Sequence, residues 1–261
     1  MIYAWIALAV IVFFVFGHIK TPYGRHFSAK WGPTVSNRWG WLIMELPVLL
    51  MLTGVLLPFI HGLSAPAWAM LSLFGIHYVN RALVFPFRLR TTGKKIPWLI
   101  VGSGVFFNLV NGFSLGYYFA HYARYGSSWF ADPHFILGII IFIIGIYVNW
   151  KSDNMLIHLR KAGDTRYLIP KNWLFEYISC PNLFGELIEW LGFALLCWNL
   201  PAFGFFCWTV ANLVPRALAH HKWYKQKFID YPVKRYAIIP YTLKVDSIWF
   251  RGIIDELAKK I

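Results

Sequence analysis

The sequence predicts an all-α protein that crosses a membrane with seven transmembrane helices. Of its 261 residues, 58% are hydrophobic and 14% are charged, whereas soluble domains contain roughly 45–50% apolar and about 25% charged residues. Apolar runs long enough to cross a bilayer recur along the whole chain. Lysine and arginine gather in alternate connections between these runs, as they do in multi-pass membrane proteins.

Seven apolar segments, separated by polar or Gly/Pro-containing breaks, are the expected spans. They cover residues 2–19, 41–60, 66–87, 97–122, 134–150, 183–199 and 201–215. The last two are short and joined only by Asn199–Pro201, which predicts a tight helical hairpin. The first has no basic residue before it and no small-residue cleavage pattern after it, which favours a retained helix over a signal peptide.

The distribution of basic residues predicts the orientation in the membrane. The first, third and fifth connections and the segment after residue 215 carry 23 Lys and Arg, whereas the opposite connections carry only Arg124. Because cytoplasmic loops are enriched in these residues, we expect the N-terminus outside and the C-terminus in the cytoplasm. The net charge of +14 therefore reflects topology rather than nucleic-acid binding. It also provides a cationic cytoplasmic face that suits an anionic cofactor or lipid headgroups.

We expect a single membrane domain over residues 1–261. It comprises a first helix and basic loop (1–40), a central region (41–243) and a C-terminal extension (244–261). Apolar and charged residues of the extension fall on opposite sides of a helix, which predicts an amphipathic helix at the membrane surface or a helix packed against a partner. The three cysteines form no CxxC pair and are expected in the core. The histidines lack repeated spaced clusters, so we expect no metal site.

Ionisable residues within the expected spans are candidates for function, because burying them in hydrocarbon is costly. The second span contains Glu45, and the third contains His77, Tyr78, Asn80 and Arg81. One interpretation is a structural ion pair between Glu45 and Arg81. The other joins Glu45 to Tyr78, so that a buried carboxyl orients the phenol hydroxyl toward a substrate carbonyl.

Two further groups of polar residues follow helical spacing and should line a cavity or contact a neighbouring helix. The first group extends from the fifth span into a basic loop and consists of Asn149, Asp153 and Arg160. The second enters the sixth span and consists of Asn182, Glu186 and Glu189. Two carboxylates one turn apart repel each other, so at least one should have a partner or a raised pKa. Asn108 and Asn111, on the fourth span, are interpreted as helix-packing residues.

A basic and aromatic cluster follows the seventh span, where the side chains suit a pyrophosphate and an adenine ring as well as lipid headgroups. Its members are Arg216, His220, His221, Lys222 and Tyr224. The sequence has no GxGxxG motif after a strand, so a nicotinamide cofactor would not be held by a dinucleotide-binding fold.

Several motifs resemble the steroid 5-alpha-reductase family. NWKSDNMLIHLR at 149–160 resembles part of its C-terminal domain, as do the later stretches KAGDTRYLIP, LFEYISCPNLFGELIEWLGFAL, ANLVPRALAHHKWY and FIDYPVKRYAIIPY. MELP at 44–47, HYVNR at 77–81 and NGFSLGYY at 111–118 extend the resemblance upstream in the same order. It covers about residues 41 to 243, which makes the central region similar to a reductase.

The resemblance implies a seven-helix enzyme that uses NADPH to reduce the carbon–carbon double bond of an enone in a steroid-like lipid. It implies that Glu45 and Tyr78 bind the substrate ketone and are catalytic, and that Glu186 lies near the substrate. The cofactor-binding positions that it implies are Asn149, Asp153, Arg160, Tyr167, Asn182, Arg216, His220 and Tyr224. Such a protein would contact membrane lipids in the endoplasmic reticulum of a eukaryote or the cytoplasmic membrane of a bacterium. A monomer would suffice.

Four residues depart from the family pattern and bear on steroid specificity more than on reductase chemistry. Met44 stands where Gln is usual beside the catalytic Glu, and Ser103, Leu115 and Leu168 stand where Arg, Gln and Arg are frequent. The alternatives are a polyprenal or enoyl-thioester reductase of the same superfamily and a membrane methyltransferase, whose RHP signature is replaced by Ser179–Pro181. A non-enzymatic lipid sensor or transporter is a further alternative.

Overall fold

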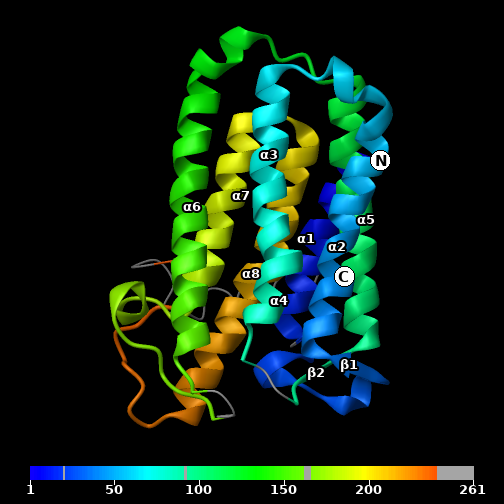
Figure 1. Cartoon of the computed structure of the whole chain (residues 1–261). Helices are drawn as coiled ribbons and strands as arrows, with labels where there is room; N and C mark the ends of the chain where they lie inside the picture. The colour runs from blue at the N-terminus through cyan, green and yellow to red at the C-terminus, as the bar shows by residue number, and fades with distance from the viewer. Residues whose placement is uncertain (20, 91–92, 162–165, 240–261) are drawn as a thin grey trace, which may run out of the picture.

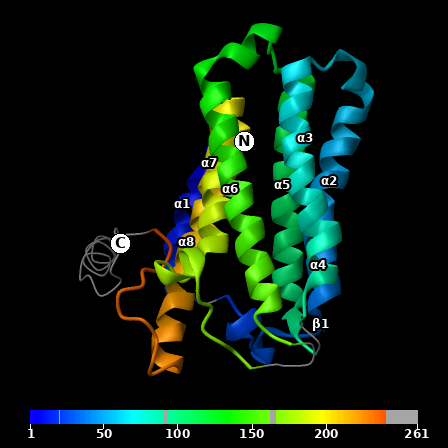
Figure 2. The ribbon, with the colours of Figure 1, turned by 60° about the vertical axis from the view of Figure 1, so that its left-hand side comes forward.

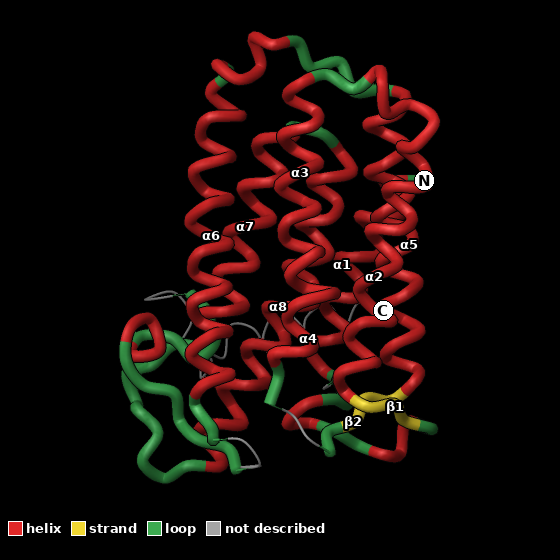
Figure 3. Tube along the Cα trace, viewed as in Figure 1, coloured by secondary structure: helices red, strands yellow, loops and turns green. Residues whose placement is uncertain are grey.

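The computed structural model describes residues 1–19, 21–90, 93–161 and 166–239, which form an elongated bundle of helices (Figure 1). The amphipathic helix predicted within 244–261 lies outside the described residues. Helices account for nearly all regular structure, so the predicted all-α class is confirmed. Figure 3 shows the exception, a two-stranded ribbon at one end of the bundle.

Each of the seven predicted segments coincides with a helix. The helices are α1 (Ile2–His18), α2 (Asn37–Leu56), α3 (Ala65–Val79), α4 (Phe85–Arg88), α5 (Trp98–His121), α6 (Pro133–His158), α7 (Pro181–Cys197) and α8 (Leu200–Lys227). The third segment is divided, because a π-helical turn at Asn80–Val84 joins α3 to α4. Within the described residues, four helical stretches are long and apolar enough to cross a membrane: Asn37–Gly62, Trp98–His121, Pro133–His158 and Leu200–Lys227.

The connections contain short ordered elements. Strands β1 (Thr34–Ser36) and β2 (Lys95–Pro97) pair antiparallel, with Val35 opposite Ile96. This ribbon ties the first basic connection to the third. The remaining short elements are 3-10 turns at Gly24–His26, Ala29–Trp31, Leu57–Gly62, Ser127–Ala131 and Trp173–Glu176.

The predicted hairpin between the last two spans is confirmed. α7 ends at Cys197 and α8 begins at Leu200. The side chain of Asn199 caps α8 by accepting a hydrogen bond from the backbone N–H of Ala202 at 2.9 Å. The Tyr125 hydroxyl donates to the carbonyl of Cys197 at 2.6 Å, which fastens the turn to the preceding connection.

Glycines bring α6 and α7 into backbone contact along their length, and the two helices lie side by side in both ribbon views (Figure 2). A Cβ atom at Gly145 would lie 2.2 Å from the backbone nitrogen of Glu189, and one at Gly185 would lie 2.3 Å from that of Asn149. Gly138 and Gly192 approach the opposite helix as closely one heptad away. Small residues allow such close packing in membranes. As a result, the helices that carry Asn149 and Glu189 have one fixed register.

An aromatic core fills the centre of the bundle between α3, α7 and α8. The rings of Phe74, Trp190, Phe193 and Phe205 lie within 5.8 Å of one another in successive pairs, and each is almost fully buried. Aromatic packing of this kind fixes side-chain orientation as well as excluding water. The ring of Tyr78 packs on this core, 4.8 Å from Phe74.

The basic connections meet at the end of the bundle that carries β1 and β2, which we call the basic end. Lys94 of the third connection lies 3.4 Å from the hydroxyl of Tyr167 in the fifth, and Arg90 donates to the carbonyl of Arg160 at 2.9 Å. Arg25 of the first connection lies over the ring of Tyr167. Loops that are far apart in the sequence therefore form one cationic surface.

Candidate functional site

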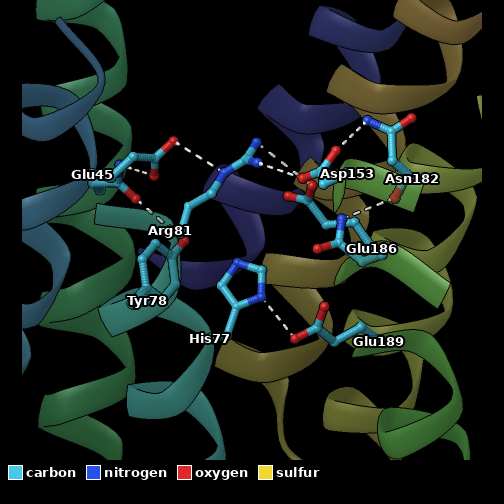
Figure 4. A network of polar contacts seen from close by, with 10 residues as sticks. Glu45, His77, Tyr78, Arg81, Asp153, Asn182, Glu186 and Glu189 are labelled. Atoms are coloured by element: carbon cyan, nitrogen blue, oxygen red, sulfur yellow. Dashed lines mark hydrogen bonds and ion pairs between the residues drawn. The ribbon is translucent and has the colours of Figure 1, made fainter. Parts of the chain in front are cut away.

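Arg81 is the centre of a polar network inside the bundle, within reach of carboxylates on three other helices (Figure 4). Its guanidinium lies 3.8 Å from Glu45 on α2, 3.9 Å from Asp153 on α6 and 3.6 Å from Glu186 on α7. The guanidinium also stacks over the ring of Trp41 at 4.5 Å. Arg81 lies on the π-helical turn, and such turns are frequent at functional sites because they redirect side chains.

Tyr78 and Glu45 are connected through Asn108 of α5. The Tyr78 hydroxyl donates to Oδ1 of Asn108 at 3.4 Å, and the Asn108 amide donates to Glu45 at 3.2 Å and to the Met44 carbonyl at 2.7 Å. The ion pair between Glu45 and Arg81 is therefore present, whereas among the described residues Glu45 is joined to Tyr78 only through Asn108. The sequence indicated only a helix-packing role for Asn108. It did not indicate that Asn108 connects Tyr78 to Glu45.

The two helical stripes meet each other, as their spacing predicts. Asn149 of α6 donates to the backbone carbonyl of Asn182 at 3.0 Å, and the Asn182 amide donates to Asp153 at 2.9 Å. Asn149 is 3% exposed and Asp153 is 8% exposed. These three residues are therefore held in fixed positions by the contact between α6 and α7.

Glu186 and Glu189 both have cationic or potentially cationic partners, which confirms the prediction made from their repulsion. Glu186 pairs with Arg81. Glu189, which is fully buried, is joined to Nδ1 of His77 by a hydrogen bond of 2.7 Å. The two carboxylates therefore point to different environments.

A cavity of about 190 Å³ is lined by five of these polar residues, and Asn149, Asp153, Asn182, His77 and Glu189 are not among its lining residues. Glu45, Tyr78, Arg81, Asn108 and Glu186 form its polar wall, and Trp190 and Phe205 are among its apolar walls. Toward the basic end the cavity reaches Tyr23 and Arg216. A compound in this cavity would meet the Tyr78 hydroxyl and the guanidinium groups of Arg81 and Arg216.

At the basic end, cations and aromatic rings alternate around the predicted cofactor residues. Tyr167 has the guanidinium of Arg160 at 5.5 Å from its ring centre and that of Arg25 at 5.8 Å. Arg25 also lies 4.5 Å from the ring of Tyr224 and 5.0 Å from that of Trp223. The sequence did not single out Arg25 or Trp223, because nothing in the pattern of the first connection indicates a contact with α8.

Two other cofactor candidates also contact the first connection. The guanidinium of Arg216 lies 4.2 Å from the ring centre of Tyr23. His220 stacks on His26, with ring centres 5.3 Å apart and ring nitrogens 3.3 Å apart. Arg160, Tyr167, Arg216, His220 and Tyr224 thus all lie around the first connection, whereas Asn149, Asp153 and Asn182 lie deeper in the bundle.

The neighbours of His220 in the sequence belong elsewhere. His221 is buried and hydrogen-bonded to Ser179 at 2.6 Å, and the Ser179 hydroxyl also contacts that of Tyr231 at 2.6 Å. Lys222 is exposed to solvent. The cluster predicted after the seventh span is therefore divided, because His221 joins α8 to the segment before α7, and Ser179 of that segment also contacts Tyr231 after α8.

Lys94 is a second cation at the basic end that the sequence counted only as a loop charge. It is half-buried between Tyr167 and the arginines. Burial, together with repulsion by Arg160 and Arg25, lowers the pKa of its ammonium group to about 8. A group anionic at neutral pH would relieve this repulsion.

Comparison with known proteins identifies the family. The model of the family described as 3-oxo-5-alpha-steroid 4-dehydrogenase matches residues 94–243. The steroid 5-alpha-reductase DET2 of Arabidopsis thaliana is 41% identical over 232 residues, which cover 85% of this chain and 88% of the relative. The 3-oxo-5-alpha-steroid 4-dehydrogenase 1 of Bos taurus is 39% identical over 245 residues, covering 90% and 93%. The human enzyme of that name is 38% identical, covering 85% and 86%.

This chain belongs to the steroid 5-alpha-reductase family. It is an oxidoreductase, and the resemblance noted in its motifs is confirmed. Family membership argues against the methyltransferase alternative. Within the part of the chain that the structure describes, no group of three or more His, Cys, Asp or Glu side chains is arranged to hold a metal ion.

The four departures from the pattern of this reductase family fall into two groups. Met44 and Ser103 line the cavity. The Met44 side chain packs closely on Gly104, because a Cβ atom at Gly104 would lie 2.1 Å from Cγ of Met44. Leu115 is buried in the apolar core, and Leu168 is 36% exposed. Of the four residues, Met44 and Ser103 alone line the cavity.

Proposed function

We propose that this protein reduces the carbon–carbon double bond of an enone lipid with NADPH, and that the lipid is a 3-oxo-4-ene steroid. The observation that carries this proposal is one cavity that joins Tyr78, supported by Asn108 and Glu45, to the cationic basic end. The names of the relatives, steroid 5-alpha-reductases of plants and animals, support the steroid as substrate class. A polyprenal or an enoyl thioester would require the same polarisation of a carbonyl.

The residues at the basic end fit a dinucleotide phosphate. One guanidinium nitrogen of Arg25, Nη1, is buried without a hydrogen-bond partner, which is costly unless an anion binds it. Among the described residues, no ion pair joins Arg25, Lys94 or Arg216 to a carboxylate. Arginine forks suit phosphate oxygens, and the rings of Tyr167 and Tyr224 suit an adenine.

We assign the cofactor to Asn149, Asp153, Arg160, Tyr167, Asn182, Arg216, His220 and Tyr224, with Arg25 and Lys94 added from the structure. When bound, NADPH supplies the hydride for the β-carbon of the enone. Asn149, Asp153 and Asn182 are fixed by one another and present amide and carboxylate groups at the inner end of this set. They are suited to orient a nicotinamide carboxamide, whereas the cations hold the phosphates.

Tyr78 would act on the carbonyl of the substrate. Reduction of an enone at its β-carbon builds negative charge on the carbonyl oxygen, and a positioned hydroxyl donor stabilises that charge. One such donor lowers the activation free energy by about 2.7–4 kcal/mol, which corresponds to a rate increase of roughly 10²–10³. The single hydroxyl proton of Tyr78 is donated to Oδ1 of Asn108 in the structure, so it would turn from Asn108 to the carbonyl oxygen when a substrate binds. Glu45 is joined to this position only through Asn108, and Arg81 balances the charge of Glu45. Glu186 lies on the same cavity wall, near the place of the substrate.

We further propose that all seven helical segments cross the membrane, as one domain that functions as a monomer, with the basic end in the cytoplasm. The nucleotide would then reach its site from the cytoplasm and the lipid would enter from the bilayer. The host membrane would be the endoplasmic reticulum of a eukaryote or the cytoplasmic membrane of a bacterium. The 23 to 1 distribution of basic residues and their meeting at one end of the bundle support this orientation.

Tyr78→Phe tests the proposed chemistry. The ring contacts with Phe74 and Trp190 remain, and only a long hydrogen bond to Asn108 is lost, so the fold and NADPH binding should persist. NADPH oxidation with a 3-oxo-4-ene steroid should fall by about 10²–10³. Tyr122→Phe, at a position 61% exposed, is the matched control and should behave as wild type.

The same assay distinguishes the alternatives. Turnover with a polyprenal or an enoyl thioester instead of the steroid would change the substrate and keep the chemistry. NADPH binding without oxidation of any enone, or binding of S-adenosylmethionine in its place, would contradict the reductase proposal. Equal activity of Tyr78→Phe and wild type would remove Tyr78 from the mechanism.

A further inference from the structure

His77 and Glu189 form a buried pair that lies outside the cavity and that the proposed chemistry does not use. Their side chains are 4% and 0% exposed, and the hydrogen bond between them is 2.7 Å long. Neither residue lines the cavity around Tyr78. Among the described residues, the second carboxylate oxygen of Glu189 has no hydrogen-bond partner, so His77 provides the only one that this carboxylate has. A polar pair this deeply buried needs a reason beyond stability, because apolar residues of equal volume often stabilise as well.

Each member of the pair precedes a residue that faces the substrate cavity. His77 is followed by Tyr78 on α3, and Glu189 is followed by Trp190 on α7. The ring of Trp190 lies 4.6 Å from that of His77 and 5.9 Å from that of Tyr78. These four residues pack together, and the hydrogen bond between His77 and Glu189 sets the position of α3 along the axis of α7. This axial position determines where the Tyr78 ring contacts Trp190.

The two sides of the pair are anchored unequally. Glu189 is held by α6, because the close approach of Gly145 leaves its backbone no freedom. In the part of the chain that the structure describes, nothing lies within 4 Å of a Cβ atom built at Gly75 of α3. A groove of about 530 Å³ lies between the outer face of α3, at Gly75 and Val79, and Trp150 of α6. Within the described ranges, the Tyr78 hydroxyl has one hydrogen bond, the 3.4 Å contact with Asn108. Beside the aromatic packing of Phe74 and the ion pairs of Arg81, the His77–Glu189 hydrogen bond is therefore the directional contact that fastens α3 next to Tyr78.

We propose that His77 and Glu189 are positioning residues, which fasten α3 to the rigid pair α6 and α7 and so hold the Tyr78 hydroxyl at the substrate carbonyl. This inference rests on the proposed function. Because small displacements of a reacting group cost large factors in rate, loss of the fastening should lower the rate of hydride transfer more than it lowers binding.

Four single variants and one double variant test the proposal. His77→Asn places an amide donor where Nδ1 lies, and Glu189→Gln keeps an acceptor oxygen, so both should retain a rate within about threefold of wild type. His77→Leu and Glu189→Leu lose the hydrogen bond, and the single-turnover rate of NADPH oxidation should fall by about tenfold or more. The dissociation constant for NADPH should change by less than about twofold, because the phosphate site lies elsewhere.

The double variant His77→Leu/Glu189→Leu separates positioning from stability. Two apolar residues leave no buried charge unpaired, so the double variant should unfold nearly as wild type does, even if one single variant fails to fold. The double variant should still oxidise NADPH slowly, because no hydrogen bond between residues 77 and 189 sets the axial position of α3 against α7. A wild-type rate in the double variant would overturn the proposal, and so would a conservative variant as slow as its leucine counterpart. Absence of enone reduction by the wild type would instead contradict the proposed function.

Discussion

Replacement of Gly145 by alanine should separate the two helices that carry the inner cofactor residues. The new methyl carbon would lie 2.2 Å from the nitrogen, 2.5 Å from the Cα and 2.8 Å from the Cβ of Glu189. Ordinary contacts begin at 3.4 Å, and the atoms in the way are mainly backbone, so no side-chain rotation can relieve the overlap. α6 and α7 must move apart by about 1 Å, and overpacking of this kind costs about 1–3 kcal/mol.

Gly102→Ala is the matched control. Gly102 also lies within a helix, α5, but nothing would lie within 4 Å of its new methyl group. Alanine favours a helix over glycine by about 0.8–1 kcal/mol, so this variant should be as stable as wild type or more so. The contrast between the two variants therefore isolates the helix contact from the intrinsic preference of the residue.

Thermal unfolding in detergent, followed by tryptophan fluorescence, measures the difference in stability. Gly145→Ala should unfold at a lower temperature than wild type. The folded fraction of Gly145→Ala should also oxidise NADPH more slowly than wild type, because Glu189 is displaced. Equal unfolding temperatures for Gly145→Ala and Gly102→Ala would refute the argument that backbone contact between α6 and α7 fixes the site.

Two further predictions concern the basic end. The Michaelis constant for NADPH should rise as the pH increases through about 8. Burial and Arg160 lower the pKa of Lys94 to about 8, and only the protonated amine, present below that pH, attracts phosphate. Lys94→Arg should flatten this profile, and a wild-type profile without a rise near pH 8 would exclude Lys94 from the site. Arg216→Ala should raise the Michaelis constant for NADPH by about tenfold or more and that for the lipid far less, whereas the reverse result in steady-state kinetics would move the phosphate site elsewhere.

Hydropathy and helical spacing were sufficient to predict the helices and the inner part of the site. Seven apolar segments coincide with helices, and the Asn149 and Asn182 stripes meet because residues four apart share a face of a helix. The strands β1 and β2 were missed because three residues are too few to show an alternating pattern. The π-helical turn at Asn80–Val84 was missed because it depends on packing around Arg81 and leaves no periodicity of its own.

Residues whose role depends on a distant loop could not be found in the same way. Arg25 lies in a short polar connection, and its contact with Tyr224 joins parts of the chain almost 200 residues apart. Asn108 resembled any amide within an apolar helix until the structure placed it between Tyr78 and Glu45. His221 carried the same sequence signal as His220, and only the direction of its side chain separates them.

The site is built from two tightly packed helix pairs, and both contribute to the cavity wall, since Glu186 and Trp190 of α7 line it. α6 and α7 also carry the inner residues that we propose to bind the cofactor, whereas α2 and α5 carry Glu45, Asn108, Met44 and Ser103. α2 and α5 also approach closely, since a Cβ atom at Gly112 would lie 2.7 Å from a backbone oxygen of α2. Substitutions at Met44 or Ser103 can therefore reshape the substrate wall without moving α6 or α7. Differences from the family at these two positions should change which enone is reduced and leave the affinity for the nucleotide intact.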